Sequence, residues 1–224
     1  MKVRLISKST SPETLEFEGM KNAQDIVAYC ARVSNPSNQI NTETSERLIR
    51  YLVKHQHWSP LEMVNACLEI ETTRDIAHQI VRHRSFAFQE FSQRYANPEE
   101  QGDMFEYSEA RLQDTKNRQN SIETSDVELQ AWWDAQQKFV TEISKKIYDE
   151  ALEKGIAKEQ ARKVLPEGLT KTKLYMNGSL RSWIHYIELR SANGTQKEHM
   201  EIAHACAKVI AGIFPLMSEL QQGE

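Results

Sequence analysis

The stretch RHRSFAFQEFSQRY, residues 82–95, is the most informative segment of the 224-residue chain. It places arginines and a histidine next to aromatic residues, followed by a glutamate, a serine and another arginine. Guanidinium groups beside flat rings suit a planar, anionic ligand. The alternative is that the cations only complement the dipole at the end of a helix. That alternative explains residues 82–84 and nothing beyond them, so we expect an anion-binding site here.

The residues before this stretch predict a helix that leads into it. Apolar side chains recur at helical spacing from Ile76 to Val81. We therefore expect a helix from Thr73 to about Arg84 with one buried face. On such a helix Gln79 lies one turn from both Arg82 and His83, on the more polar side.

The residues after Ser85 predict an extended segment. The next residues include neither Gly nor Pro, and their aromatic content favours a strand. In an extended segment Glu90, Ser92 and Arg94 share one face, because side chains alternate with a period of two. This row offers an acceptor, a hydroxyl and a guanidinium, which together suit a phosphate and a neighbouring polar group.

Arg-His-Arg, seven further residues and then Ser resembles the signature of the flavin-dependent thymidylate synthases, and residues 82–92 match it in full. Other segments are also similar to that family. His57 and Ser59 stand in a segment of His, any residue, Ser, Pro, any residue and Glu. Arg162 stands in a segment of Ala-Arg, two residues and Leu-Pro. The resemblance runs from about His55 to the C-terminal helix.

A further similar segment surrounds residue 180. The family has Asn, one residue, Arg, a His or Asn four residues on, and a Leu-Arg or Met-Arg ending. Arg181, His185 and Arg190 match this pattern, but Ser179 stands where Asn is usual. A hydroxyl and an amide offer different hydrogen bonds. The flavin contact is therefore left open between Ser179 and Asn177.

The resemblance implies an enzyme that methylates deoxyuridylate (dUMP) to thymidylate (dTMP). Methylenetetrahydrofolate would supply the carbon, FAD would carry the reducing equivalents, and NADPH would reduce the flavin. It also implies an α+β fold, an antiparallel sheet packed with long helices in a single domain, and a homotetramer with sites shared between chains. The implied flavin-binding residues are His57, Ser59, Arg82, His83, Arg84, Glu90, Ser179, Arg181 and His185. The implied nucleotide-binding residues are Gln79, Arg82, Glu90, Ser92, Gln93, Arg94, Arg162 and Arg190.

The chemistry of this reaction requires extra electron density on the uracil ring, because C5 is otherwise a poor nucleophile. A cysteine that adds to C6 is one solution, but Cys30, Cys67 and Cys206 have no polar catalytic partners in the sequence. The other solution is a fixed cation beside N3 and its carbonyl group. Arg190 is the family's residue for that role, so we expect it to be the catalytic residue. Ser92 is expected to bind the nucleotide and not to attack it.

Composition argues against several classes of function. A net charge of −4 disfavours non-specific nucleic-acid binding. No apolar run approaches the roughly 20 residues of a membrane span, and the N-terminus lacks the apolar core of a signal peptide. Three widely spaced cysteines predict a cytoplasmic protein without disulfides or a metal site. The eight scattered glycines form no phosphate-binding loop, so side chains must hold any nucleotide.

The remaining segments are predicted to be scaffold. Strict alternation from Met63 to Glu71 predicts a half-buried strand with its even-numbered residues inward. Residues 2–7 predict a strand that pairs with a second strand at Leu15 and Phe17. The polar stretch 97–124 is predicted to be a mobile lid or a surface excursion. The long helix that follows has an apolar stripe between Leu129 and Leu152, which predicts core or subunit contact.

Two other functions stay open. A different flavin or nucleotide enzyme would reuse the anion site, and only methyl transfer to dUMP separates it from a thymidylate synthase. A non-enzymatic helical interaction protein would bind an acidic partner through the basic stripe. Such a protein would be colourless after purification, whereas a flavoprotein is yellow.

Overall fold

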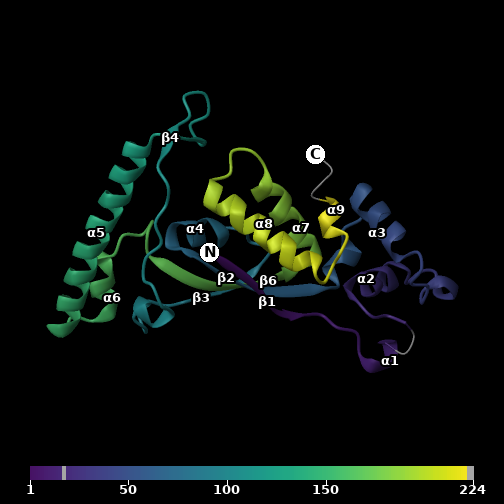
Figure 1. Cartoon of the computed structure of the whole chain (residues 1–224). Helices are drawn as coiled ribbons and strands as arrows, with labels where there is room; N and C mark the ends of the chain where they lie inside the picture. The colour runs from purple at the N-terminus through teal and green to yellow at the C-terminus, as the bar shows by residue number, and fades with distance from the viewer. Residues whose placement is uncertain (17–18, 221–224) are drawn as a thin grey trace.

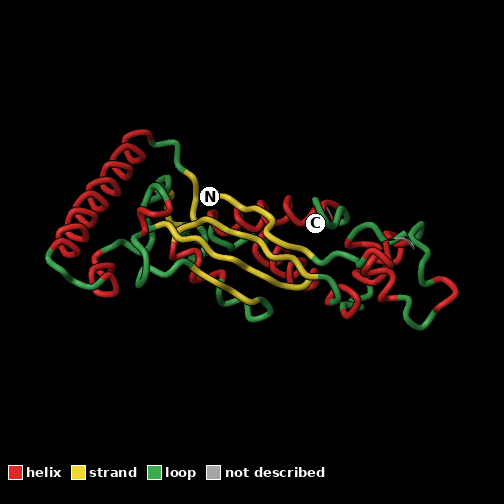
Figure 2. Tube along the Cα trace, turned by 90° about the horizontal axis from the view of Figure 1, so that it is seen from below, coloured by secondary structure: helices red, strands yellow, loops and turns green. Residues whose placement is uncertain are grey.

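A four-stranded antiparallel sheet forms the centre of the computed structural model, which describes residues 1–16 and 19–220. The strand order is β1 (Lys2–Lys8), β2 (Asn65–Thr73), β6 (Lys171–Ser179) and β3 (Ala87–Glu90). Three helices, α4 (Arg74–Ile80), α7 (Leu180–Ser191) and α8 (Lys197–Ala211), lie over one face of this sheet (Figure 1). Seen from below, the strands lie in front of these helices (Figure 2). The predicted α+β fold with an antiparallel sheet is confirmed.

The core lies between the sheet and these three helices. The alternation predicted for residues 63–71 is confirmed, because Ala66, Leu68 and Ile70 of β2 are buried. Glu69 on the opposite face is also buried, at 3% exposure, and accepts hydrogen bonds from Arg4 of β1 at 2.6 and 3.0 Å. A buried carboxylate is costly unless it is paired, so this contact fastens β1 to the sheet. The helices contribute these buried side chains to the same core: Ile76, Ile80, Trp183, Ile184, Ile202, Cys206 and Ile210.

Shorter helices build one end of the molecule. They are α2 (Ala23–Ala31), η1 (Pro36–Asn38), α3 (Ser45–Lys54) and η2 (Ser59–Glu62), with α9 (Met217–Leu220) beside α8. The side chain of Asn22 caps α2 by accepting from two backbone N–H groups.

The predicted strand at Leu15 is wrong, because α1 (Glu13–Glu16) is helical and Phe17 lies outside the described residues. Strand β1 pairs with β2 instead, and the paired residues are about sixty to seventy positions apart in sequence. Local alternation gave no sign of that partner, because sheet pairing depends on tertiary packing.

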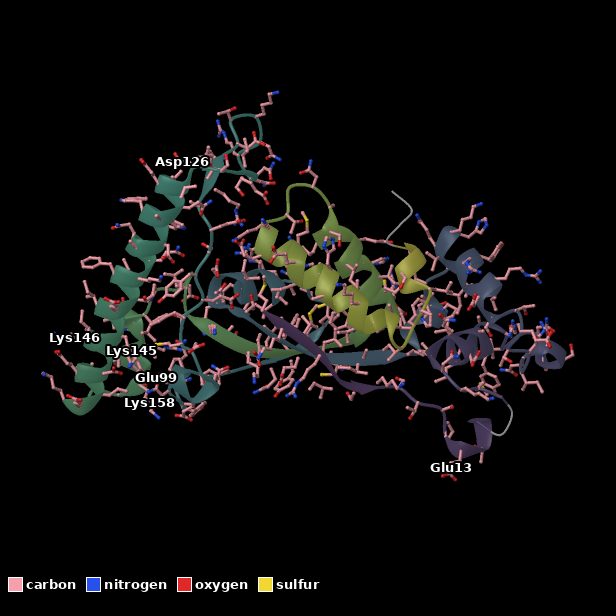
Figure 3. The ribbon with its side chains drawn as sticks, in the orientation of Figure 1. Glu13, Glu99, Asp126, Lys145, Lys146 and Lys158 are labelled. Atoms are coloured by element: carbon pink, nitrogen blue, oxygen red, sulfur yellow. The ribbon has the colours of Figure 1, made fainter. Side chains whose placement is uncertain are left out.

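The opposite end is built by α5 (Val127–Glu153), α6 (Lys158–Ala161) and η4 (Arg162–Val164). The stretch 97–124 contains η3 (Pro98–Gln101) and a hairpin of β4 (Arg111–Gln113) and β5 (Ser121–Glu123). Lys145 of α5 pairs with Glu99 at 2.7 Å, and Figure 3 shows both near Lys158 at the foot of the helix. The expected role of this stretch as a lid stays a prediction.

The long helix α5 packs on its own chain through two kinds of contact. Gln137 and Thr141 are buried polar residues. Near its end, Tyr148 lies in a small apolar cluster, and Ala151 and Leu152 of the predicted stripe pack against that cluster. Much of the predicted apolar stripe is exposed, including Trp132 at 56% and Phe139 at 59%. For these residues the core alternative does not apply, and subunit contact stays a prediction. No helix within the described residues is both long and apolar enough to cross a membrane.

Candidate functional site

The turn after α4 and the end of α7 meet through His83 and Arg190. Arg190 Nε donates a hydrogen bond to His83 Nε2 at 2.9 Å. Burial, together with the positive charge of Arg190, lowers the pKa of His83 from 6.5 to about 4. His83 is therefore neutral at physiological pH and accepts through Nε2. The two terminal nitrogens of Arg190 make no hydrogen bond to another described residue.

A second series of hydrogen-bonded polar side chains lies beside this pair. Sequence reasoning predicted Gln79 as a site residue but missed Tyr186 and His199. The hydroxyl of Tyr186 is 3.2 Å from His199 Nε2, and His199 Nδ1 is 3.2 Å from Gln79 Oε1. Gln79 Nε2 then donates to Gln196 Oε1 at 2.8 Å. The rings of Tyr186 and His83 meet edge to face at 4.9 Å, so this series of side chains contacts the His83–Arg190 pair. A Tyr and a His on the otherwise apolar sides of their helices were the only sequence signal.

The basic turn comes earlier than predicted, because α4 ends at Ile80 and not near Arg84. Bonds from the N–H groups of residues 82 and 83 to carbonyl groups three residues earlier close a tighter turn. Phe86 then packs edge to face against Trp183 at 4.8 Å, which draws the chain into the core. Arg82 and Arg84 are left exposed, without an ion-pair partner within the described part of the chain.

The predicted row of Glu90, Ser92 and Arg94 does not form, because β3 ends at Glu90 and the chain turns. Glu90 faces the sheet, where it accepts from Thr172 Oγ1 at 2.9 Å and pairs with Arg74 at 3.4 Å. The backbone N–H of Arg94 instead points back to Ser92 Oγ, at 3.4 Å. Ser92 and Arg94 are therefore close to each other because the chain turns, and not because they alternate along a strand.

The turn brings Arg94 to the segment that carries Arg162. Arg94 Nε is 3.6 Å from the carboxylate of Glu159, which lies one turn before Arg162. Lys158 Nζ also donates to the carbonyl group of Tyr95 at 3.1 Å. Gln93 is buried in the same turn, and its Nε2 has no hydrogen-bond partner among the described residues. The segment that carries Arg162 therefore lies beside the turn that carries Ser92 and Arg94, and this turn also contains an unsatisfied donor.

A separate group forms at the start of α7. Arg181 pairs with Glu62 of η2 at 2.5 Å, and the ring of His185 meets Trp58 edge to face at 4.5 Å. His57 and Ser59 are exposed beside them in the sequence. Each contact joins the segment before β2 to the same helix, so the structure brings these predicted flavin residues together.

The hydroxyl of Ser179 is used within the fold. Ser179 Oγ caps α7 by accepting from the N–H of Ser182 at 3.3 Å. Asn177, the other candidate for the flavin contact, is exposed on β6 opposite Ala87. Ser179 Oγ is also 3.2 Å from Ser182 Oγ, which itself donates to the carbonyl group of Ser85, so the Ser179 proton is directed at Ser182. Because both functions of the Ser179 hydroxyl are used within the fold, this geometry favours Asn177 over Ser179 as the residue that is free to bind a ligand.

The candidate residues therefore form separate groups along the molecule. One group lies at the start of α7, one at its end around Arg190, and one at the turn near α6 (Figure 1). Arg181 and Arg190 alone are about 13 Å apart along the helix, at 1.5 Å per residue. No group of acidic, histidine and cysteine side chains suited to a metal ion occurs among residues 1–16 and 19–220.

Comparison with known proteins gives a consistent result. The family model described as thymidylate synthase complementing protein matches residues 17–216. A probable flavin-dependent thymidylate synthase of Paramecium bursaria Chlorella virus 1 is 50% identical over 202 residues, which cover 90% of this chain and 92% of that protein. A flavin-dependent thymidylate synthase of Synechocystis is 49% identical and covers 97% of this chain and 98% of its own length.

Solved structures show a similar fold. A UMP/dUMP methylase, PolB from Streptomyces cacaoi, bound with 5-Br dUMP, superimposes with a TM-score of 0.80 at 25% identity. The match covers 98% of this chain and 93% of that chain. Because the family model and both close relatives span nearly all of the sequence, including the basic turn and Arg190, this chain belongs to the flavin-dependent thymidylate synthase family.

Proposed function

We propose that this enzyme converts dUMP to dTMP by reductive methylation. Methylenetetrahydrofolate is the proposed carbon donor, FAD the cofactor and NADPH the reductant. The observation that carries the proposal is the contact between Arg190 and His83, at 2.9 Å. It gives the site a permanently charged guanidinium that is fixed from one side and free on the other.

Arg190 is the proposed catalytic residue. Its terminal N–H groups would lie beside N3 and a carbonyl group of uracil and stabilise the negative charge that makes C5 nucleophilic. Because neutral His83 takes the Nε–H, the guanidinium keeps its fork for the base and needs no reorientation. A carboxylate in place of His83 would neutralise the charge, whereas an imidazole leaves it intact.

The cysteines offer no competing mechanism. Burial raises the pKa of all three thiols, and Cys206 is completely buried in the core. A thiol with a raised pKa carries less thiolate, which is the nucleophilic form. This environment supports activation of the ring by charge, without addition of a cysteine to C6.

The exposed guanidinium groups fit an anionic cofactor such as FAD. Arg82 and Arg84 are the proposed pyrophosphate ligands, since neither has an ion-pair partner in the described part of the chain. His57, Arg181 and His185 are proposed to border the same cofactor at the start of α7. When bound, FAD supplies the redox chemistry, and the residues of this chain supply position and charge.

The turn after β3 is the proposed phosphate site of the nucleotide. Ser92 and Arg94 are proposed to bind the phosphate, with Arg162 from the neighbouring segment. The ion pair between Arg94 and Glu159 is long, at 3.6 Å, and both side chains are half-exposed. Such a pair contributes little stability, so a phosphate can replace the carboxylate at low cost. Gln93 is proposed to complete this site with its unpaired Nε2. The predicted contact of Glu90 with the nucleotide stays a prediction, because its carboxylate already accepts from Thr172 and pairs with Arg74.

A homotetramer with shared sites is the proposed assembly. The three groups of site residues lie apart from one another on a single copy of the chain. One copy therefore does not bring all of them to one ligand. A second copy could bring the start of one α7 to the end of another. The exposed apolar stripe of α5 supports such contact, because large apolar patches on a surface are typical of interfaces. A cytoplasmic location also stays a prediction.

Product formation from defined mixtures tests the proposed function. The purified protein should be yellow and should form dTMP from dUMP when methylenetetrahydrofolate and NADPH are both present. Omission of either one should stop turnover. A yellow protein that binds nucleotide but forms no dTMP would indicate a different flavin enzyme, and a colourless protein that FAD does not stabilise would contradict the proposal altogether.

A further inference from the structure

The series of hydrogen bonds from Tyr186 to Gln196 has only one direction that satisfies both of its buried members, Tyr186 and His199. Burial raises the pKa of Tyr186 well above its usual value, so its phenol is neutral. Tyr186 as a whole is only 1% exposed, so its hydroxyl proton needs an acceptor within the protein. The structure offers His199 Nε2 as that acceptor. Tyr186 therefore donates to Nε2, which leaves the imidazole proton on Nδ1.

The reverse direction would leave a buried proton without a partner. If His199 carried its proton on Nε2, the Tyr186 hydroxyl would accept it. Its own proton would then have no acceptor within residues 1–16 and 19–220. An unsatisfied buried donor costs about 1–3 kcal/mol. Burial, with the nearby charge of Arg190 and the His83 ring, lowers the pKa of His199 to about 3, so the doubly protonated form is also disfavoured.

This direction fixes the amide of Gln79. His199 Nδ1–H donates to Gln79 Oε1 at 3.2 Å, and Gln79 Nε2–H donates to Gln196 at 2.8 Å. The second N–H of Gln79 has no partner in the described part of the chain. Gln79 lies one helical turn before His83, the residue that holds Arg190. The ring of His199, which holds the amide, is 6.4 Å from the ring of His83, so the amide offers a donor, and not its carbonyl group, on the side of the His83–Arg190 pair.

We propose that Tyr186 and His199 are positioning residues that hold the Gln79 amide with an N–H toward the base of the bound nucleotide. The Gln79 N–H would then donate to the C4 carbonyl group of uracil, at the position where cytosine carries an amino group that cannot accept. Two buried side chains that touch no ligand would thus help to select the base. This inference rests on the proposed nucleotide site.

The tautomer of His199 is directly measurable. In protein labelled with ¹⁵N-histidine, the imidazole nitrogen shifts separate the two neutral tautomers and the imidazolium. At pH 7.5, without ligands, the expected state of His199 is neutral with the proton on Nδ1. The His199→Asn variant assigns its signals by their loss. A proton on Nε2, or a doubly protonated ring, would overturn the inference whatever the enzyme binds.

Base selection gives the functional test. The ratio of Kd for dCMP to Kd for dUMP is measured by calorimetry on the FAD-loaded protein. Tyr186→Phe removes only the hydroxyl. Without it, His199 can adopt the other tautomer and the Gln79 amide can flip by 180°. The ratio should fall by about tenfold, the effect of one neutral hydrogen bond. His199→Leu should lower it at least as much, whereas His199→Asn can still donate to Gln79 and should keep most of it.

Tyr148→Phe is the matched control, because this tyrosine is equally buried but lies on α5, and its hydroxyl has no partner among the described residues. Its ratio should equal that of the wild type. If Tyr186→Phe and His199→Leu bind dUMP with an unchanged ratio, this inference is overturned and the proposed function is not affected. Wild-type protein that binds FAD but neither nucleotide would overturn the proposed function and this inference with it.

Discussion

The ring of Phe86 lies against Gly178 of β6 so closely that a Cβ at that position would stand 2.4 Å from Phe86 Cδ1. No real Cβ contact is that short, so only glycine permits this packing. Phe86 in turn meets the rings of Trp183 and Tyr186. The strand therefore carries a glycine where the segment after the basic turn crosses it, and this contact positions the turn.

Gly178→Ala should destabilise the protein by about 1–3 kcal/mol, as expected for overpacking of a core. The free energy of unfolding in urea measures the effect. Gly168→Ala is the control, since nothing lies within 4 Å of a Cβ there. Phe86→Leu in the same chain should recover part of the loss, because contacting residues are not additive. Equal stability of Gly178→Ala and wild type would contradict the packing.

Acid should destabilise the fold through His83 and His199. The pKa values of both lie below the usual 6.5 in the folded protein, at about 4 and about 3. Below about pH 6.5 the unfolded chain therefore binds protons that the folded chain does not bind. Stability is fully present above that pH and falls below it, by at most ~1.4 kcal/mol per pH unit for each histidine.

Urea unfolding at pH 7.5, 6.0 and 5.0 measures this slope. Carboxylates also contribute at the lowest pH, so the useful quantity is the difference between wild type and His199→Asn. The variant should lose stability less steeply between pH 6.0 and 5.0. Parallel curves for the two proteins would mean that His199 is protonated in the fold, contrary to its buried contacts with Tyr186 and Gln79.

Arg94→Ala should weaken dUMP binding by roughly ten- to a hundredfold, because one charge-assisted contact to phosphate contributes ~1.5–3 kcal/mol. Deoxyuridine has no phosphate, so its affinity should change much less. Arg47→Ala, an exposed arginine of α3, is the matched control and should leave both affinities unchanged. Calorimetry provides the four values, and equal losses for nucleotide and nucleoside would assign Arg94 another role.

Shared sites predict rescue between inactive chains. Arg82→Ala and Arg190→Ala should each be inactive alone and partly active after they are refolded together, since some mixed sites would draw both intact segments from different copies. Mixing without subunit exchange is the control and should give nothing. Full activity of a monomer at high dilution, or no rescue after verified exchange, would show that each chain builds its own site.

Sequence patterns predicted the parts of the fold that depend on local periodicity. Alternation identified the strand with Leu68 and Ile70 inward, and both are fully buried. It failed where tertiary packing decides. The end of α4 depends on Phe86, whose partners Gly178 and Trp183 lie about a hundred residues away. No local rule places them together.

The site shows the same division. The basic turn is apparent from its residue types, and the family resemblance added Arg162 and Arg190. The hydrogen bond between Arg190 and His83 spans 107 residues, and that between His199 and Gln79 spans 120. Such contacts follow only from the packing of α4, α7 and α8. A buried histidine also reads as core in a sequence, because its partner is not visible there.

The central claim is that Arg190, and no cysteine, activates the uracil ring. The most direct measurement is the rate of dTMP formation by two FAD-loaded variants, Arg190→Ala and the triple variant Cys30→Ser, Cys67→Ser and Cys206→Ala. FAD binding and melting temperature confirm that each is folded. The triple variant should retain dTMP formation, and Arg190→Ala should lose it by at least about a hundredfold, the effect of one preorganised charge donor. A folded, FAD-bound triple variant without activity, or an active Arg190→Ala, would contradict the account.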